Sequence, residues 1–292
     1  MRKSFTLVEI LVVIVVIGIL SAFILVGMSS ITESANITKS KAFANSLRNS
    51  LLNSLISEWK LDGNTNDSWG NATCSLNGTT TVDTCVYGSC FNFDGSDDYI
   101  NCGTNSSLAP TDYITVSFWV NFNSIANMQY IVSRGRDSYG SGYNVLKYSN
   151  SNFAFEVNLD NVDDNPEIDI SGTTFIAANK WYNVVATYDY SSGARLYVNG
   201  KKENSSSLTG SIVYRAGQGD NFLIGVMSHS FPQYFDTDAK IDDIKFFNGI
   251  MPATAIINNY YIGLIKLYKN NGISSIEFNR RTVDLKNNLF NN

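Results

Sequence analysis

An apolar segment opens the chain. After a basic tip at Arg2 and Lys3, nearly every residue from Phe5 to Val26 is apolar. A helix of about 20 apolar residues is long enough to cross a bilayer core of roughly 30 Å. The pattern therefore predicts one membrane-spanning helix over about residues 5–28, with the rest of the chain on the exported side.

A second segment continues this helix with a different pattern. Residues 29–57 contain no Pro and no Gly, and their apolar positions recur at spacings of three and four, which marks one apolar face of a helix. These positions include Ala44, Leu47, Leu51, Leu52, Leu55 and Ile56. The sequence predicts one long α-helix over residues 5–57 that is apolar all round in its first half and amphipathic in its second.

One carboxylate, Glu9, interrupts the apolar run. An ionisable group in hydrocarbon costs at least about 2.5 kcal/mol, so it normally has a partner or a function. Glu9 is therefore a candidate functional residue.

The stretch SFTLVEILVVIVVIGIL resembles the amino-terminal segment of bacterial type IV pilins and of the pseudopilins of type II secretion. In that family a prepilin peptidase cuts just before a Phe, which becomes the methylated first residue. The resemblance implies a leader of residues 1–4, cleavage between Ser4 and Phe5, and pairing of Glu9 with the amino terminus of a neighbouring subunit during filament assembly. Ser4 stands where the family usually has Gly. A plain single-pass anchor is the alternative.

Short segments with period-two alternation follow Ile56, separated by Gly, Asn, Ser and Asp, which is the pattern of an all-β sandwich or jelly roll. In ITVSFWVNF one face of a strand is apolar, formed by Ile114, Val116, Phe118, Val120 and Phe122. Further predicted strands are FNFD, YIVS, YNVLKY, FAFEVN, WYNVVATYDY, ARLYV, NFLIGV and KIDDIKFF. Asn199-Gly200 predicts a two-residue hairpin turn.

The order of these segments resembles the concanavalin A-like lectin and glucanase fold in its laminin G-like form. The similar stretches are FNFDGSDDYINCG, ITVSFWVNF, KWYNVVATYDYSSGARLYVNGK, NFLIGV and IDDIKFFNGIMPATAIINNYY. The resemblance implies a mainly-β jelly-roll head over residues 58–265, carried on the amino-terminal helix and followed by a tail over residues 266–292.

Calcium is the candidate cofactor of this head. The loop after residue 61 offers Asp62, Asn64 and Asp67, whose hard oxygen atoms suit calcium. The resemblance implies a structural calcium shared between the first-strand loop and the aspartate of the last-strand I-D-D motif. Strand alternation places Asp242 on the inward face and Asp243 on the outward one. The alternative is an Asx-rich turn, with Asp242 satisfied by backbone N–H groups.

Four cysteines lie close together on the exported side: Cys74, Cys85, Cys90 and Cys102. An even count in an oxidising compartment predicts two disulfides, for which three pairings exist. Cys90 and Cys102 flank a predicted hairpin and could lie opposite each other, which would leave Cys74 for Cys85. A zinc site is the alternative, although none of the cysteines has the two-residue spacing typical of one.

Charge and residue counts exclude several classes of function. The net charge of -5 and the scattered Lys and Arg leave no basic stripe for nucleic acid. The chain has one histidine, so no multi-histidine zinc site or well-supported catalytic triad can form. In PEIDISG, Glu167 and Asp169 resemble part of a glucanase motif, but the third carboxylate is missing. We expect no enzymatic activity.

The sequence thus predicts a minor pilin or pilin-like surface protein, built into a filament by its helix and displaying a lectin-like head for adhesion. Its expected partners are other pilin-like subunits, prepilin peptidase, the membrane, and a glycan or surface protein. We expect it in the cytoplasmic membrane as a single-pass protein, then at the cell surface or in a pilus. The alternatives are a type II secretion pseudopilin and a membrane-anchored adhesin outside any filament.

Overall fold

The computed structural model describes residues 51, 53–135, 140–160, 168–215, 221–227 and 236–290. They all belong to the second of two compact units, Met1–Leu47 and Arg48–Asn292. The predicted cleavage site at Ser4 and Phe5, Glu9 and the predicted membrane-spanning segment lie outside the described residues. None of the helices that the structure describes is long and apolar enough to cross a membrane.

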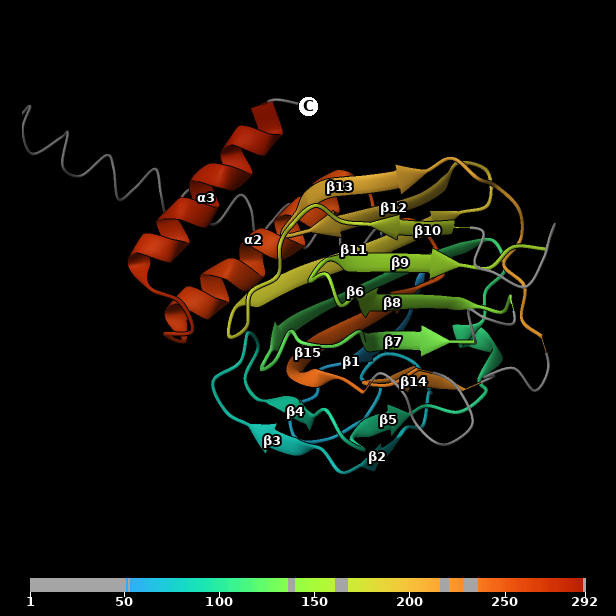
Figure 1. The fold of residues 1–292 in the computed structure, drawn as a ribbon, viewed down its shortest axis with the longest axis horizontal. Helices are drawn as coiled ribbons and strands as arrows, with labels where there is room; N and C mark the ends of the chain where they lie inside the picture. The colour runs from blue at the N-terminus through green and yellow to red at the C-terminus, as the bar shows by residue number, and fades with distance from the viewer. Residues whose placement is uncertain are drawn as a thin grey trace, which may run out of the picture. The chain divides into compact units, whose positions relative to one another are not determined.

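Two antiparallel sheets form a sandwich, as Figure 1 shows, which confirms the predicted mainly-β class. The first sheet has the order β13-β12-β11-β6-β15-β4-β3, with β1 paired to β15, and the second has the order β10-β9-β8-β7-β14-β5-β2. The strands of the first sheet are β1 (Leu55–Trp59), β3 (Thr80–Val82), β4 (Cys90–Asp94), β6 (Tyr113–Phe122), β11 (Trp181–Asp189), β12 (Gly193–Val198), β13 (Lys201–Ser206) and β15 (Asp238–Phe247). Those of the second are β2 (Ser75–Asn77), β5 (Tyr99–Asn101), β7 (Gln129–Arg134), β8 (Tyr143–Lys147), β9 (Phe153–Val157), β10 (Ile168–Ser171) and β14 (Phe222–Ile224).

The core lies between the two sheets and follows the predicted alternation. The five apolar residues of β6 from Ile114 to Phe122 are fully buried in it, facing residues such as Val145 and Phe155 of the second sheet. The predicted turn is also confirmed, because β12 and β13 are joined by Asn199 and Gly200, both with positive φ. A short 3₁₀ helix, Ser106–Leu108, precedes β6.

The head begins earlier than residue 58, the boundary that the sequence predicts. β1 starts at Leu55 and pairs with β15, so residues 55–57, which the sequence placed in the predicted helix, belong to a strand. Trp59 at the end of β1 is fully buried and stacks on Phe222, with ring centroids 5.3 Å apart. Removing residues 55–57 would therefore take a strand out of the first sheet.

Two helices, and not a tail, complete the carboxyl end. Helix α2 (Ala253–Lys269) starts directly after Pro252, and α3 (Ser275–Phe290) folds back beside it (Figure 1). Their apolar side chains cover the outer face of the first sheet in a cluster of Trp119, Trp181, Tyr260, Leu264, Leu267 and Leu285. The predicted tail over residues 266–292 is thus the end of α2 followed by α3.

Both predicted disulfides are present, but their pairing differs from the one favoured by the sequence. Cys74 pairs with Cys102, and Cys85 with Cys90. Strands β4 and β5 belong to different sheets, so the cysteines that flank them are not opposite each other. Instead, Cys74 precedes β2 and Cys102 follows β5, its antiparallel neighbour, and a turn closed by Cys85 N donating to Gly88 O (2.9 Å) brings Cys85 to Cys90.

Candidate functional site

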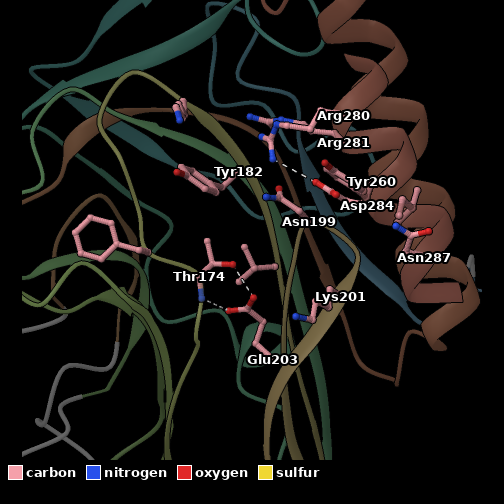
Figure 2. A pocket seen from close by; sticks show the side chains of 14 residues that line it. Thr174, Tyr182, Asn199, Lys201, Glu203, Tyr260, Arg280, Arg281, Asp284 and Asn287 are labelled. Carbon is pink, nitrogen blue, oxygen red and sulfur yellow. Dashed lines mark hydrogen bonds and ion pairs between the residues drawn. The ribbon is translucent and has the colours of Figure 1, made fainter. Parts of the chain in front are cut away.

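A polar cleft of about 480 Å³ lies between the edge of the first sheet and helix α3 (Figure 2). One side is formed by Thr174 and Glu203, and the opposite side by Arg280 and Asp284 of α3. Ligand pockets in proteins typically measure about 300–1,000 Å³. The cleft is therefore large enough for a small ligand or a few units of a polymer.

Glu203 fixes the first side of the cleft. Its Oε2 accepts hydrogen bonds from the backbone N of Thr173 (2.8 Å) and of Thr174 (2.7 Å), and its Oε1 accepts one from Thr174 Oγ1 (2.6 Å). These bonds tie the loop before β11 to β13. Because both carboxylate oxygens are engaged, Glu203 serves mainly to shape the wall.

An ion-pair network fixes the second side. Glu277 Oε1 accepts from Arg280 Nη2 (2.8 Å) and from Arg281 Nε (2.8 Å), while Arg280 Nη1 donates to Asp284 Oδ2 (3.2 Å). The hydrogen bond from Arg280 is the main cause that lowers the pKa of Glu277 to about 2. Arg281, which is 7% exposed, also donates to the backbone oxygen of Trp181 (2.8 Å), and this bond anchors α3 to the sheet.

Between these sides the cleft offers cations, amide groups and an aromatic ring. Lys180 and Lys201 are exposed, and neither has an ion pair with any residue that the structure describes. Asn199 has its Oδ1 bound to the backbone N of Asn183 (3.0 Å), which leaves its amide nitrogen to face the cleft (Figure 2). The ring of Phe175 is 70% exposed, a large fraction for an aromatic side chain.

Sequence reasoning missed this cleft. The spacing of Glu277, Arg280, Arg281 and Asp284 at three and four residues is a helix signal that was present in the chain. It indicates α3 but not the place where α3 docks. The lining residues come from four separate parts of the chain, so only the tertiary fold brings them together.

The predicted calcium ligands of the first loop are occupied by the chain itself. Asp67 Oδ1 accepts from the backbone N of Glu58 (3.0 Å) and Gly70 (2.8 Å), and its Oδ2 from that of Ala72 (3.1 Å). Asn64 Oδ1 accepts from the backbone N of Asn66 (3.0 Å), and Asp62 Oδ1 from that of Ser89 (2.9 Å). These bonds fit the Asx-rich turn that was the alternative.

A β-bulge overturns the predicted orientation of the I-D-D aspartates. The register of β15 against β6 shifts after Asp242, and Asp243 has φ 52°. Asp242 therefore lies on the outer face of the sheet, opposite Trp119, and both aspartates are buried, at 0% and 6% exposed. Asp243 does not face solvent as predicted but forms an ion pair with Lys245.

Asp242 is only half satisfied in this position. Its Oδ2 accepts from the backbone N of Tyr87 (2.9 Å), whereas its Oδ1 is buried and has no hydrogen-bond partner among the described residues. Burial, followed by the charge of Asp243, raises the pKa of Asp242 well above its ordinary value. The backbone N–H groups of Tyr87 and Val86 oppose this shift.

Another acidic group gathers at the end of β4. Carboxylate oxygens of Asp94, Asp97 and Asp98 lie within 4.8 Å of one another. Burial, followed by the charges of these three, raises the pKa of nearby Asp236 to about 6. None of these residues was singled out from the sequence.

Of the two residues that resemble part of a glucanase motif, Glu167 and Asp169, the structure describes only Asp169. Glu167 lies outside the described residues. Asp169 of β10 is exposed and lies opposite Glu156 of β9, which is buried and accepts a hydrogen bond from the Tyr148 hydroxyl (2.9 Å).

Comparison with known proteins defines the class of the molecule. The family described as the concanavalin A-like lectin/glucanases superfamily matches residues 94–257, more than half of the chain. The protein belongs to that superfamily. Residues 1–25 match the prokaryotic N-terminal methylation motif, so the chain joins a prepilin-type start to a lectin-type domain. No curated protein matches the chain.

Several solved structures share the fold. The receptor binding domain of botulinum neurotoxin mosaic serotype C/D is 18% identical with a TM-score of 0.57, covering 74% of this chain and 52% of that one. The binding domain of Paraclostridial Mosquitocidal Protein 1 is 15% identical with a TM-score of 0.58, covering 73% and 53%. The binding domain of botulinum neurotoxin DC in complex with SialylT is 16% identical with a TM-score of 0.55, covering 72% and 52%. The chain thus spans about half the length of these structures, and the likeness concerns the fold alone.

Proposed function

We propose that the protein is a minor pilin-like subunit whose amino-terminal helix enters a filament and whose head binds a ligand outside the cell. The observation that carries the proposal is the prepilin-type motif at residues 1–25 joined to a lectin-type sandwich. A head that starts near Arg48 and continues to the carboxyl end is large for the repeating unit of a thin filament. A minor or tip subunit suits that size better than a major one.

The cleft beside α3 is the ligand site in this proposal. It is supported by its volume, by its hydrogen-bonding side chains and by the exposed ring of Phe175. Its walls are held by Glu203 and by the Glu277 network, so a ligand would meet a preformed surface. Both carboxylates that line the cleft, Glu203 and Asp284, accept hydrogen bonds from the chain, which favours binding over hydrolysis, and we propose a protein without enzymatic activity.

Two other functions remain as alternatives. A type II secretion pseudopilin would share the processing step and the helix, and an anchored adhesin would share the head. Isolation of filaments separates these possibilities, because only a pilus subunit is recovered in surface filaments. The genes that neighbour this one give a second test, since a pilus requires an assembly ATPase and several similar subunits.

Processing gives the first prediction. Mass spectrometry of the mature protein should find Phe5 as the first residue, carrying an N-methyl group. Ser4→Gly should be cleaved at least as well, because Gly is the residue usual in the family at this position. An intact Met1 in cells that contain prepilin peptidase, or a mature terminus near residue 22, would contradict the pilin-like hypothesis.

Structural calcium in the head is a second part of the proposal. It is supported by the buried, unpartnered Oδ1 of Asp242, whereas Asn64 and Asp67 already accept hydrogen bonds from the chain. If calcium binds at Asp242, excess calcium should raise the melting temperature of metal-stripped protein by several degrees, because it binds the folded state only. Asp242→Asn should remove this response, and Asp160→Asn, the same change at an exposed aspartate after β9, should keep it. Equal melting temperatures with calcium and with chelator would reject the site.

A further inference from the structure

Charge in the cleft differs from charge in the rest of the protein. The whole chain has a net charge of -5, yet four basic side chains line the cleft against two carboxylates. The basic residues are Lys180, Lys201, Arg280 and Arg281, and the carboxylates are Glu203 and Asp284. A concave surface with one dominant sign of charge concentrates ions of the opposite sign.

The hydrogen bonds show which of these charges can reach a ligand. Arg281 is buried between Glu277 and the backbone of Trp181, and Arg280 is held by Glu277 and Asp284. Glu203 is bound to the loop at Thr173 and Thr174.

Lys180 and Lys201 therefore carry the charge that remains exposed to the cleft, since neither is paired with a described residue. A lysine ammonium on its flexible stem offers three donors, which suits a carboxylate or sulfate oxygen.

The other exposed groups suit a sugar ring. The ring of Phe175 is 70% exposed and gives an apolar surface on which the C–H face of a pyranose can stack. The amide nitrogen of Asn199 can donate to a sugar hydroxyl. One wall of the cleft, α3, lies beyond residue 257, where the match to the superfamily ends. The site is thus built partly from chain that the family description does not cover.

We infer that this cleft binds an acidic saccharide, with Lys180 and Lys201 holding its carboxylate or sulfate groups and Phe175 stacking on a ring. The inference rests on the proposed function, which makes the cleft a ligand site, and it adds the chemical class of the ligand.

The test compares matched saccharides on full-length protein in detergent. Calorimetry should detect tetragalacturonate but only weak binding of its methyl ester, which has the same rings without the charge. A sulfated and an unsulfated dextran tetrasaccharide form the second arm, which separates sulfate from carboxylate. Binding of the acidic member of either pair should weaken as salt increases.

Variants locate the binding. Lys180→Gln combined with Lys201→Gln should weaken binding of the acidic saccharide by roughly tenfold or more, at the upper end of what two solvent-exposed charge pairs contribute. Both side chains are exposed, so the fold should be unchanged. The matched control is Lys202→Gln with Lys286→Gln, which removes the same charge from exposed positions outside the cleft and should leave the affinity unchanged. Phe175→Ala should weaken binding of charged and neutral saccharides alike.

The outcomes separate the inference from the proposed function. Equal binding of tetragalacturonate and its ester, lost in Phe175→Ala but not in the lysine variant, would keep the cleft as a glycan site and overturn the acidic class. Equal losses in the cleft and control lysine variants would also overturn the inference. Binding of a hexaglutamate peptide without any saccharide would replace the glycan by an acidic peptide. No binding of any probe would remove the ligand role of the cleft, while the Phe5 terminus would still test the pilin-like part.

Discussion

Glu9→Leu should be inserted into the membrane as well as the parent protein and yet be almost absent from filaments. Removing the carboxylate lowers the cost of insertion by at least about 2.5 kcal/mol, so the amount in the membrane should not fall. If Glu9 pairs with the amino terminus of a neighbouring subunit, as the pilin-like proposal requires, assembly should fail because that pair is lost. Immunoblots of membranes and of sheared surface filaments measure the two quantities separately.

The matched control for this variant is Ile10→Leu, which places the same residue type at the next position without changing charge. It should enter filaments at the parental level. If Glu9→Leu also reached that level, the carboxylate would have no part in assembly. If both variants were missing from the membrane, the defect would lie in insertion, which would contradict the expected result as well.

Gly263→Val should cause a large loss of stability in the head. A Cβ atom at Gly263 would lie 2.3 Å from Cζ2 and 2.7 Å from Cε2 of Trp119, closer than side chains can approach. Trp119 is fully buried between the sheet and α2, so it has no space into which to move. Overpacking of this kind costs about 1–3 kcal/mol and occasionally more. Because α3 follows α2, a shift of the helices should also disrupt the cleft.

Urea unfolding of residues 48–292, followed by circular dichroism, measures this loss. Lys266→Val is the control, since it introduces the same side chain on the exposed side of the same helix. It should cost under about 1 kcal/mol, the difference in helix propensity. An unchanged unfolding midpoint for Gly263→Val would mean that α2 does not pack on Trp119 as described.

The local pattern of apolar and turn residues was enough to predict much of the sandwich. The alternation in β6 predicted the inward residues correctly, because successive side chains of a strand point to opposite faces and the apolar set lies on the buried face. Asn199-Gly200 predicted the β12–β13 turn correctly, because that turn needs positive φ at both positions.

Elsewhere the outcome depended on contacts between distant parts of the chain. At Asp243 a single extra residue in β15 reverses the side on which Asp242 lies, and alternation cannot reveal such a bulge. Cys90 and Cys102 look like a hairpin pair in sequence, but their strands separate into different sheets. The cleft required α3 to dock beside β13, a placement that depends on Arg281 reaching the Trp181 backbone, 100 residues away.

The position of β1 determines how the head would carry mechanical load. β1 pairs with β15 inside the first sheet, whereas the cleft adjoins β13 at one edge of that sheet. Tension between a ligand in the cleft and the chain entering at Leu55 would pass sideways through β12, β11 and β6 to β15, borne by rows of backbone hydrogen bonds. Neither disulfide crosses that path, because both join chain that follows β1. In flowing liquid, the force needed to pull β1 out of the first sheet would be set by the β1–β15 pairing and would be insensitive to reducing agents.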